Sequence, residues 1–118
     1  MEQHPQEKVQ IAIDALLDRR GQDVVVMDMR DVTTICDYFV ICHGLSPTHI
    51  DALAEEVQQK MKASGHLPLH IEGSKDGRWM IQDYLEVVVH IFAQEARRFY
   101  DLQRLWSDAR IVAEYTEE

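Results

Sequence analysis

The stretch Ile35–Met61, ICDYFVICHGLSPTHIDALAEEVQQKM, contains a strand, a helix start and an amphipathic helix in direct succession. Its first part, Ile35–His43, is rich in aromatic and β-branched residues, which predicts a strand. Ser46 is a favourable N-cap, and Pro47 suits the first helical position, where a missing N–H costs nothing. Apolar residues then recur at three- and four-residue steps until Gly65 ends the helix. A strand that leads straight into a helix predicts a sheet with helices packed on it.

The residues before this stretch predict one more helix and one more strand. Between about Pro5 and Arg20 the apolar side chains fall on one helical face, and Gly21 is a natural stop. Asp23–Met29 follows with a run of apolar residues on both faces, which is typical of a covered central strand.

The residues after this stretch predict three strands and a last helix, at Leu67–Glu72, Arg78–Gln82, Glu86–Phe92 and about Ala93–Ala109. The spacing of the last helix predicts that its inner side carries Phe99, Leu102, Leu105 and Trp106. Both ends of the chain are predicted to be loose: residues 1–5, and the residues from about Ile111 onward, where glutamates collect.

The predicted order is α-β-β-α-β-β-β-α, an α/β (α+β) fold with a mixed five-stranded sheet flanked by helices. A chain of 118 residues is long enough for a single domain with its own core, here about residues 5–109 followed by an acidic tail. We expect the last three strands to form a meander. A strand that joins the sheet across the second helix can lie parallel to its neighbour.

The charge balance narrows the class of partner. Twelve Lys and Arg residues stand against 21 Asp and Glu residues, so the net charge is −9. Binding through nucleic-acid phosphates depends on a basic face, whereas an acidic chain meets a basic protein more readily. No stretch approaches the roughly 20 apolar residues that span a bilayer, and no secretory signal is visible. We therefore expect a cytoplasmic protein with little or no nucleic-acid binding and no membrane contact.

The two cysteines predict no disulfide. If Cys36 and Cys42 share one strand, they lie about 20 Å apart along it, far beyond bridging distance. They are interpreted as reduced core thiols. Together with His43 and His49 they also lack the paired short gaps of a zinc site.

No catalytic, metal-binding or cofactor-binding residue is predicted. Gly73-Ser74-Lys75 is interpreted as a turn, because a Walker motif needs a longer spacing and a following helix. Ser46 is more simply a helix cap than a nucleophile, since the Gly-x-Ser-x-Gly setting is missing.

Two residues admit both a structural and a binding interpretation. His90 lies in an alternating strand and is either a hydrogen-bonded structural histidine or a residue at the edge of a binding surface. Trp79 shares one strand face with Ile81 and Asp83. It is either a core residue or an interface anchor, because tryptophan buries a large area with little flexibility.

Several segments together resemble one known family. Residues 36–46 resemble the D-x-hydrophobic-hydrophobic-I-x-x-G-x-S core of the ribosomal silencing factor family (RsfS, also called Iojap or YbeB), and His49 and the following helix match as well. A longer block is similar in order and spacing: Glu72-Gly73, Trp79–Tyr84, Val87–Phe92, Glu95–Leu102 and Leu105-Trp106. The resemblance covers about residues 5–109.

The resemblance implies a function without chemistry. Members of this family bind the large ribosomal subunit at ribosomal protein uL-fourteen, occupy the place where the small subunit docks, and so damp translation when nutrients are scarce. Their fold is related to that of nucleotidyltransferases. The resemblance places on or beside the partner surface Trp79, Asp83, Tyr84 and His90, and further Asp37, Tyr38, Glu72 and Glu95. It also allows a homodimer in isolation.

Two alternatives remain open. One is an adaptor that helps the large subunit assemble. The other is a nucleotidyltransferase-like enzyme, for which Gly44 and Ser46 provide a Gly-Ser element, although the chain has no Asp-x-Asp pair to hold magnesium.

Overall fold

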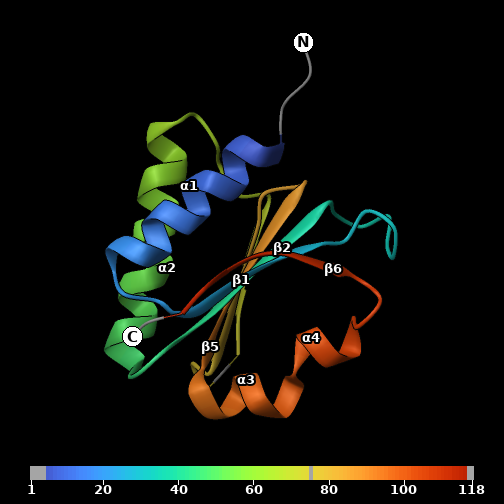
Figure 1. The fold of residues 1–118 in the computed structure, drawn as a ribbon. Helices are drawn as coiled ribbons and strands as arrows, with labels where there is room; N and C mark the ends of the chain where they lie inside the picture. Colours follow the sequence, from blue (N-terminus) through green and yellow to red (C-terminus); the bar gives the residue numbers. More distant parts are fainter. Residues whose placement is uncertain (1–4, 75, 117–118) are drawn as a thin grey trace.

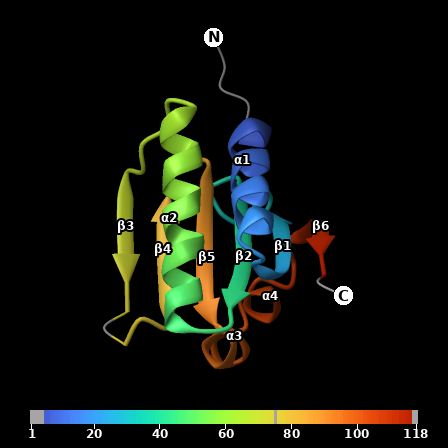
Figure 2. The same cartoon turned by 90° about the vertical axis from the view of Figure 1, so that its left-hand side faces the viewer.

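A computed structural model describes residues 5–74 and 76–116. One mixed sheet forms the centre, with α1 (Pro5–Asp18) and α2 (Pro47–Ala63) packed on one of its faces (Figures 1 and 2). The shorter α3 (Gln94–Tyr100) and α4 (Leu102–Leu105) lie at one end of the other face (Figure 1). Within the described residues, no helix has the length and apolar character needed to cross a membrane.

The sheet has six strands in the spatial order β3-β4-β5-β2-β1-β6. Their bounds are β1 Gln22–Asp28, β2 Tyr38–Gly44, β3 His70–Gly73, β4 Trp79–Asp83, β5 Val87–Ala93 and β6 Arg110–Tyr115. Strands β2 and β5 are parallel, and every other neighbouring pair is antiparallel. The predicted fold class, the meander β3-β4-β5 and the parallel pair across α2 are therefore confirmed.

The prediction of five strands and a loose tail from Ile111 was wrong. Arg110–Tyr115 forms β6, which pairs with β1 and closes that edge of the sheet. Ala113 and Tyr115 pack against the core under the helices, and this contact favours a strand over a free tail. The chain ends were also predicted to be loose. Of these residues, 1–4 and 117–118 lie outside the described part of the chain.

The prediction of one continuous last helix was also wrong. Asp101 has a left-handed backbone, with φ of 37°, and separates α3 from α4. Its side chain accepts a hydrogen bond from the Arg104 N–H and so caps the second piece. Because the break changes the phase of the helical face, Leu102 is buried as predicted, whereas Phe99 is 80% exposed and Leu105 is also exposed.

Strand β2 begins at Tyr38 instead of Ile35, so Cys36 lies in the preceding loop and the distance argument along one strand does not apply to it. Both cysteines are nevertheless free and buried, as predicted. Burial raises the pKa of Cys42 to about 12, so this thiol stays protonated and unreactive.

The start of α2 is built as its sequence predicts. The Ser46 hydroxyl oxygen accepts a hydrogen bond from the His49 N–H at 3.0 Å, and Pro47 occupies the first turn. Gly44 is required just before it, because a Cβ there would lie 2.9 Å from Cγ1 of Ile50. This close approach seats α2 directly on the end of β2.

Candidate functional site

The face of the sheet opposite α1 and α2 carries a connected group of rings, here called the aromatic platform: Phe39, Trp79, His90, Phe92, Tyr100 and Trp106. The Trp79 ring lies 4.8 Å from the Phe92 ring and 4.6 Å from the Tyr100 ring, measured between centroids. Phe39 meets His90 edge-on at 4.5 Å. Strands β2, β4 and β5 and the α3–α4 segment all contribute, so the platform exists only in the folded chain.

The platform is only partly covered. Phe92 and His90 are buried, but Phe39, Trp79 and Trp106 are half-buried and Tyr100 is exposed. Beside Trp79, a groove of about 390 Å³ runs to Tyr100 and Phe99. Half-exposed aromatic rings around a groove are the residue type and shape that anchor protein interfaces.

The other end of this face carries two exposed aliphatic side chains next to two carboxylates. Ile35 is 76% exposed and Leu85 is 56% exposed. Asp37 lies two residues after Ile35, and Asp83, the last residue of β4, lies two residues before Leu85. Burial, and then the negative charges of Asp37 and Asp83, raise the pKa of the Cys36 thiol to about 11.

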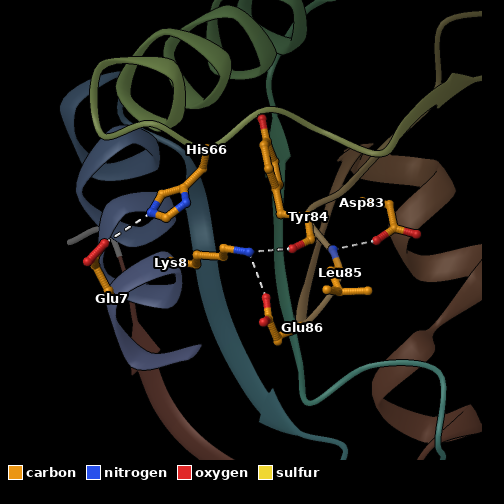
Figure 3. A network of polar contacts seen from close by, with 7 residues as sticks. All are labelled: Glu7, Lys8, His66, Asp83, Tyr84, Leu85 and Glu86. Atoms are coloured by element: carbon orange, nitrogen blue, oxygen red, sulfur yellow. Dashed lines mark hydrogen bonds and ion pairs between the residues drawn. The ribbon is translucent and has the colours of Figure 1, made fainter. Parts of the chain in front are cut away.

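The turn that presents Leu85 is held from several sides (Figure 3). Lys8 of α1 donates to the Tyr84 carbonyl at 2.9 Å and to the Glu86 carboxylate at 2.6 Å. The Leu85 N–H donates to Asp83 at 2.8 Å, and Leu85 itself has a φ of 78°. A leucine in the left-handed region is strained. These hydrogen bonds therefore hold the exposed Leu85 in a backbone conformation that leucine rarely adopts.

Four carboxylates lie along the rim of this face. Besides Asp37 and Asp83 these are Glu72 and Glu95. Glu72 stands opposite Ile81 in the β3–β4 ladder, so both side chains point to the same face. Glu95 lies in the first turn of α3 with a largely exposed side chain, 3.9 Å from Arg78. An apolar centre with an acidic rim is suited to a basic protein surface.

His90 acts within the platform as a structural residue. Its Nδ1 accepts a hydrogen bond from the Trp79 indole N–H at 3.2 Å, which orients the Trp79 ring. Its Nε2 has no partner among the described residues. Burial lowers the pKa of His90 to about 3, so the ring is neutral near pH 7. His90 is therefore a buried, hydrogen-bonded histidine that orients Trp79, and its place beside a partner surface stays a prediction.

Tyr38 and Tyr84, the remaining predicted site residues, lie on the helix-covered side of the sheet. Tyr84 is 1% exposed, and its hydroxyl donates to Gln82 at 2.8 Å, while the Gln82 amide donates to the Ala54 carbonyl of α2 at 2.9 Å. Burial raises the pKa of Tyr84 to about 12. Both tyrosines therefore belong to the core below the site, and neither extends its surface.

Sequence reasoning missed Phe39, Tyr100, Ile35 and Leu85 as members of this face. Phe39 alternates with Tyr38, and that alternation was the available signal. Ile35 and Leu85 flank Asp37 and Asp83 in turns, where an apolar residue is unexpected. No pattern announced Tyr100, because its position follows from the break at Asp101.

The candidate metal and catalytic groups have other roles. His49 uses both ring nitrogens: Nδ1 accepts from the Leu45 N–H at 2.9 Å, and Nε2 lies 2.7 Å from the Arg19 carbonyl, to which it donates. The described residues contain no group of three or more His, Cys, Asp or Glu side chains that could hold a metal ion.

Comparison with known proteins points in one direction. A family model described as "Ribosomal silencing factor during starvation" matches residues 2–118. The chain is 36% identical over 107 residues to a ribosomal silencing factor RsfS of Halalkalibacterium halodurans, covering 91% of this chain and 92% of that protein. A crystal structure of a Chromobacterium violaceum protein superposes with a TM-score of 0.85 at 33% identity, covering 89% and 88% of the two chains.

A more distant relative is the mouse protein named "Mitochondrial assembly of ribosomal large subunit protein 1". It is 26% identical over 102 residues, which are 84% of this chain and 45% of the mouse protein. The family is one of ribosome-associated regulators and is not a known family of enzymes. With a match over nearly the whole length and the same fold, the chain belongs to the ribosomal silencing factor family.

Proposed function

We propose that this protein binds the large ribosomal subunit through the open face of its sheet and blocks joining of the small subunit by its bulk. Ribosomal protein uL-fourteen is the proposed contact, and repression of translation when nutrients are scarce is the proposed outcome. The observation that carries the proposal is the half-covered aromatic platform with carboxylates around it. Family membership supports the ribosome as the target.

Trp79 is the central anchor in this proposal. Its ring is already oriented by Phe92, Tyr100 and the hydrogen bond to His90, so little side-chain entropy is lost on docking. The groove beside it can take an apolar partner side chain. Ile35 and Leu85 add apolar contact at the far end of the face.

The charge of the chain selects protein over RNA on the particle. With a net charge of −9, the chain is repelled by phosphate and attracted to Lys and Arg side chains. Asp37, Glu72, Asp83 and Glu95 are the carboxylates placed to pair with such residues. Rim charges of this kind chiefly raise the association rate, and high salt reduces this effect because it screens the charges.

The test of the anchor is co-sedimentation of a Trp79→Ala variant with purified large subunits. Loss of an aromatic anchor costs about 2 kcal/mol or more, roughly a 30-fold weaker affinity. A Leu17→Ala variant, altered at an exposed position on α1, is the matched control and should bind normally. Undiminished binding by a folded Trp79→Ala variant contradicts the anchor role.

The blocking step needs its own assay. Light scattering follows reassociation of the two ribosomal subunits in the presence of saturating protein. The native chain should slow reassociation, and Trp79→Ala should restore it at equal concentration. Normal reassociation with the native chain bound would refute the proposed steric mechanism while leaving subunit binding intact.

The second candidate is an adaptor in large-subunit assembly, favoured by the name of the mouse relative. Sedimentation profiles of cells that lack the protein separate the two functions. Immature large subunits indicate assembly, whereas mature subunits that join too readily during starvation indicate silencing. The nucleotidyltransferase-like alternative predicts a magnesium-dependent thermal shift with nucleotides. The homodimer stays a prediction.

A further inference from the structure

A second hollow lies apart from the aromatic platform, at the carboxyl ends of the parallel strands β2 and β5. It has a volume of about 590 Å³. Both strands point toward α3 in Figure 2. The chain leaves β2 into α2 on one face of the sheet and leaves β5 into α3 on the other (Figures 1 and 2). This hollow lies on the α3 side of the sheet, where α3 and the start of α4 face residues of β1, β2, β5 and β6.

Arg97 of α3 is the central charged group of this cavity. Its Nη1 donates to the Gln22 carbonyl at 3.2 Å and to His43 Nδ1 at 3.0 Å, and its Nη2 donates to Gln103 at 3.1 Å. All three acceptors are neutral. A guanidinium has five N–H donors, so the Nε donor and one on Nη2 have no hydrogen-bond partner among the described residues.

The surroundings of Arg97 make these free donors unusual. Its side chain is half-buried, and burial lowers its pKa, whereas Asp23 and Asp101 act in the opposite direction without forming an ion pair with it. These donors stay open to water, and an anion that replaced the water would gain charge-assisted hydrogen bonds from them. Free donors facing a cavity therefore point to a carboxylate or a similar group from outside the chain.

Carboxylates share the lining of the cavity with Arg97. Asp23 is the exposed second residue of β1, and Glu114 on β6 pairs with Val25 of the same strand. Both carboxylates line the cavity, as does Asp101. A purely anionic ligand is repelled by these groups, and a purely cationic ligand is repelled by Arg97 and Arg98. Only a ligand with both charges uses the whole lining.

We propose that this cavity binds a small zwitterion of the free α-amino acid class. Arg97 binds the ligand's carboxylate, and Asp23 with Glu114 binds its ammonium group. Phe92, Ile41 and Leu102 form the apolar floor against which the rest of the ligand packs. No covalent step is involved.

This site is independent of the proposed docking surface. Phe92 lies between them: Trp79 stacks on its ring from the β4 side, and the cavity opens on the side of β1 and β2. Loss of ligand binding therefore leaves ribosome binding intact, and loss of ribosome binding leaves the cavity intact.

Isothermal titration calorimetry of the full chain with each proteinogenic L-amino acid is the first test. At least one should bind. Two analogues of that amino acid, the amine without the carboxylate and the acid without the ammonium, should each bind about tenfold more weakly, as expected for losing one charged hydrogen-bonded contact. Absence of any binding, or equal binding by either analogue, overturns the proposal.

Variants then assign the residues. Arg97→Gln should weaken binding by about tenfold or more, while Arg104→Gln, an exposed arginine outside this cavity, should leave it unchanged. Arg97 also donates hydrogen bonds to Gln22 and Gln103, so Arg97→Gln can disturb the fold. The double variant Asp23→Asn with Glu114→Gln therefore serves as a second test of ligand binding with little risk to folding. Asn tolerates the left-handed backbone of Asp23. Native affinity in either folded variant contradicts the assignment.

Discussion

The two faces of the central sheet are built from alternate residues of the same strands but are finished differently. On β5, Val87, Val89 and Ile91 point under α1 and α2 and are sealed there. Val88, His90 and Phe92 point to the opposite face, which α3 and α4 cover only at one end (Figure 1). One strand thus supplies both a closed core and the base of a recognition surface. We infer that the helix-covered face contributes most of the stability, so the open face can keep exposed apolar residues.

The largest effect should come from the closed face. Leu53→Ala removes a fully buried side chain that packs between α2 and the sheet, so the free energy of unfolding should fall by about 3 kcal/mol. Urea denaturation measures it, with Leu67→Ala at an exposed position as the control. A loss below about 1 kcal/mol, the size of an ordinary surface change, contradicts the idea that this face carries the stability.

The buried ring of His90 predicts a pH dependence. Its pKa of about 3 in the folded chain lies below the ordinary value of 6.5, so the unfolded state binds the proton more tightly and stability falls as the pH drops below about 6.5. Between pH 7 and pH 5 the native chain should lose about 2 kcal/mol more than His90→Asn. Parallel urea titrations at both pH values measure this difference, and equal losses contradict it. The loss should level off only near pH 3.

The clamp between Lys8 and Glu86 connects the two faces, because it reaches from α1 to the turn that presents Leu85 (Figure 3). Burial raises the pKa of Glu86, but the hydrogen bonds from Lys8 and from its own backbone N–H outweigh burial and leave the pKa below its usual value. Lys8→Met leaves a partly buried carboxylate unpaired and should cost about 1.5 kcal/mol in thermal or urea unfolding.

A double-mutant cycle checks that clamp. Lys8→Met combined with Glu86→Gln should cost less than the sum of the two single variants, since the second change removes the charge that the first leaves unpaired. Additive costs contradict a direct interaction between the two side chains.

The smallest change in the free energy of unfolding is expected at the open face, and it should be an increase. Leu85→Gly removes a left-handed backbone strain of about 1–2 kcal/mol. The added entropy of glycine in the unfolded chain offsets about 0.5–1 kcal/mol of this gain, so the free energy of unfolding should rise by about 0.5 kcal/mol. The same variant should bind large subunits more weakly, by about fivefold, because it removes an exposed apolar contact. Stability and binding then move in opposite directions, and a parallel change in both contradicts the division between the faces.

Local pattern predicted much of this fold. The alternation along residues 86–92 assigned each side chain of β5 to its face, and Ser46 with Pro47 placed the start of α2. The strand at Arg110–Tyr115 escaped because the glutamates at positions 114, 117 and 118 suggested an acidic tail, although Ile111 and Val112 favour a strand once β1 lies beside them. Of the candidate site residues, Trp79, Asp83 and three more carboxylates lie on or around one face, whereas the two tyrosines lie below it.

Which residues share a side and where the helices begin could be predicted from the sequence, because periodicity and capping are properties of neighbouring residues, and the acidity of the chain follows from its composition. Which side is covered depends on contacts between distant segments. That outcome depends on the break between α3 and α4 at Asp101, on the hydrogen bond between Lys8 and Glu86, which are 78 residues apart, and on the parallel pairing of β2 with β5. Each joins segments far apart in the chain, and the free energy of such contacts is not encoded in any local pattern.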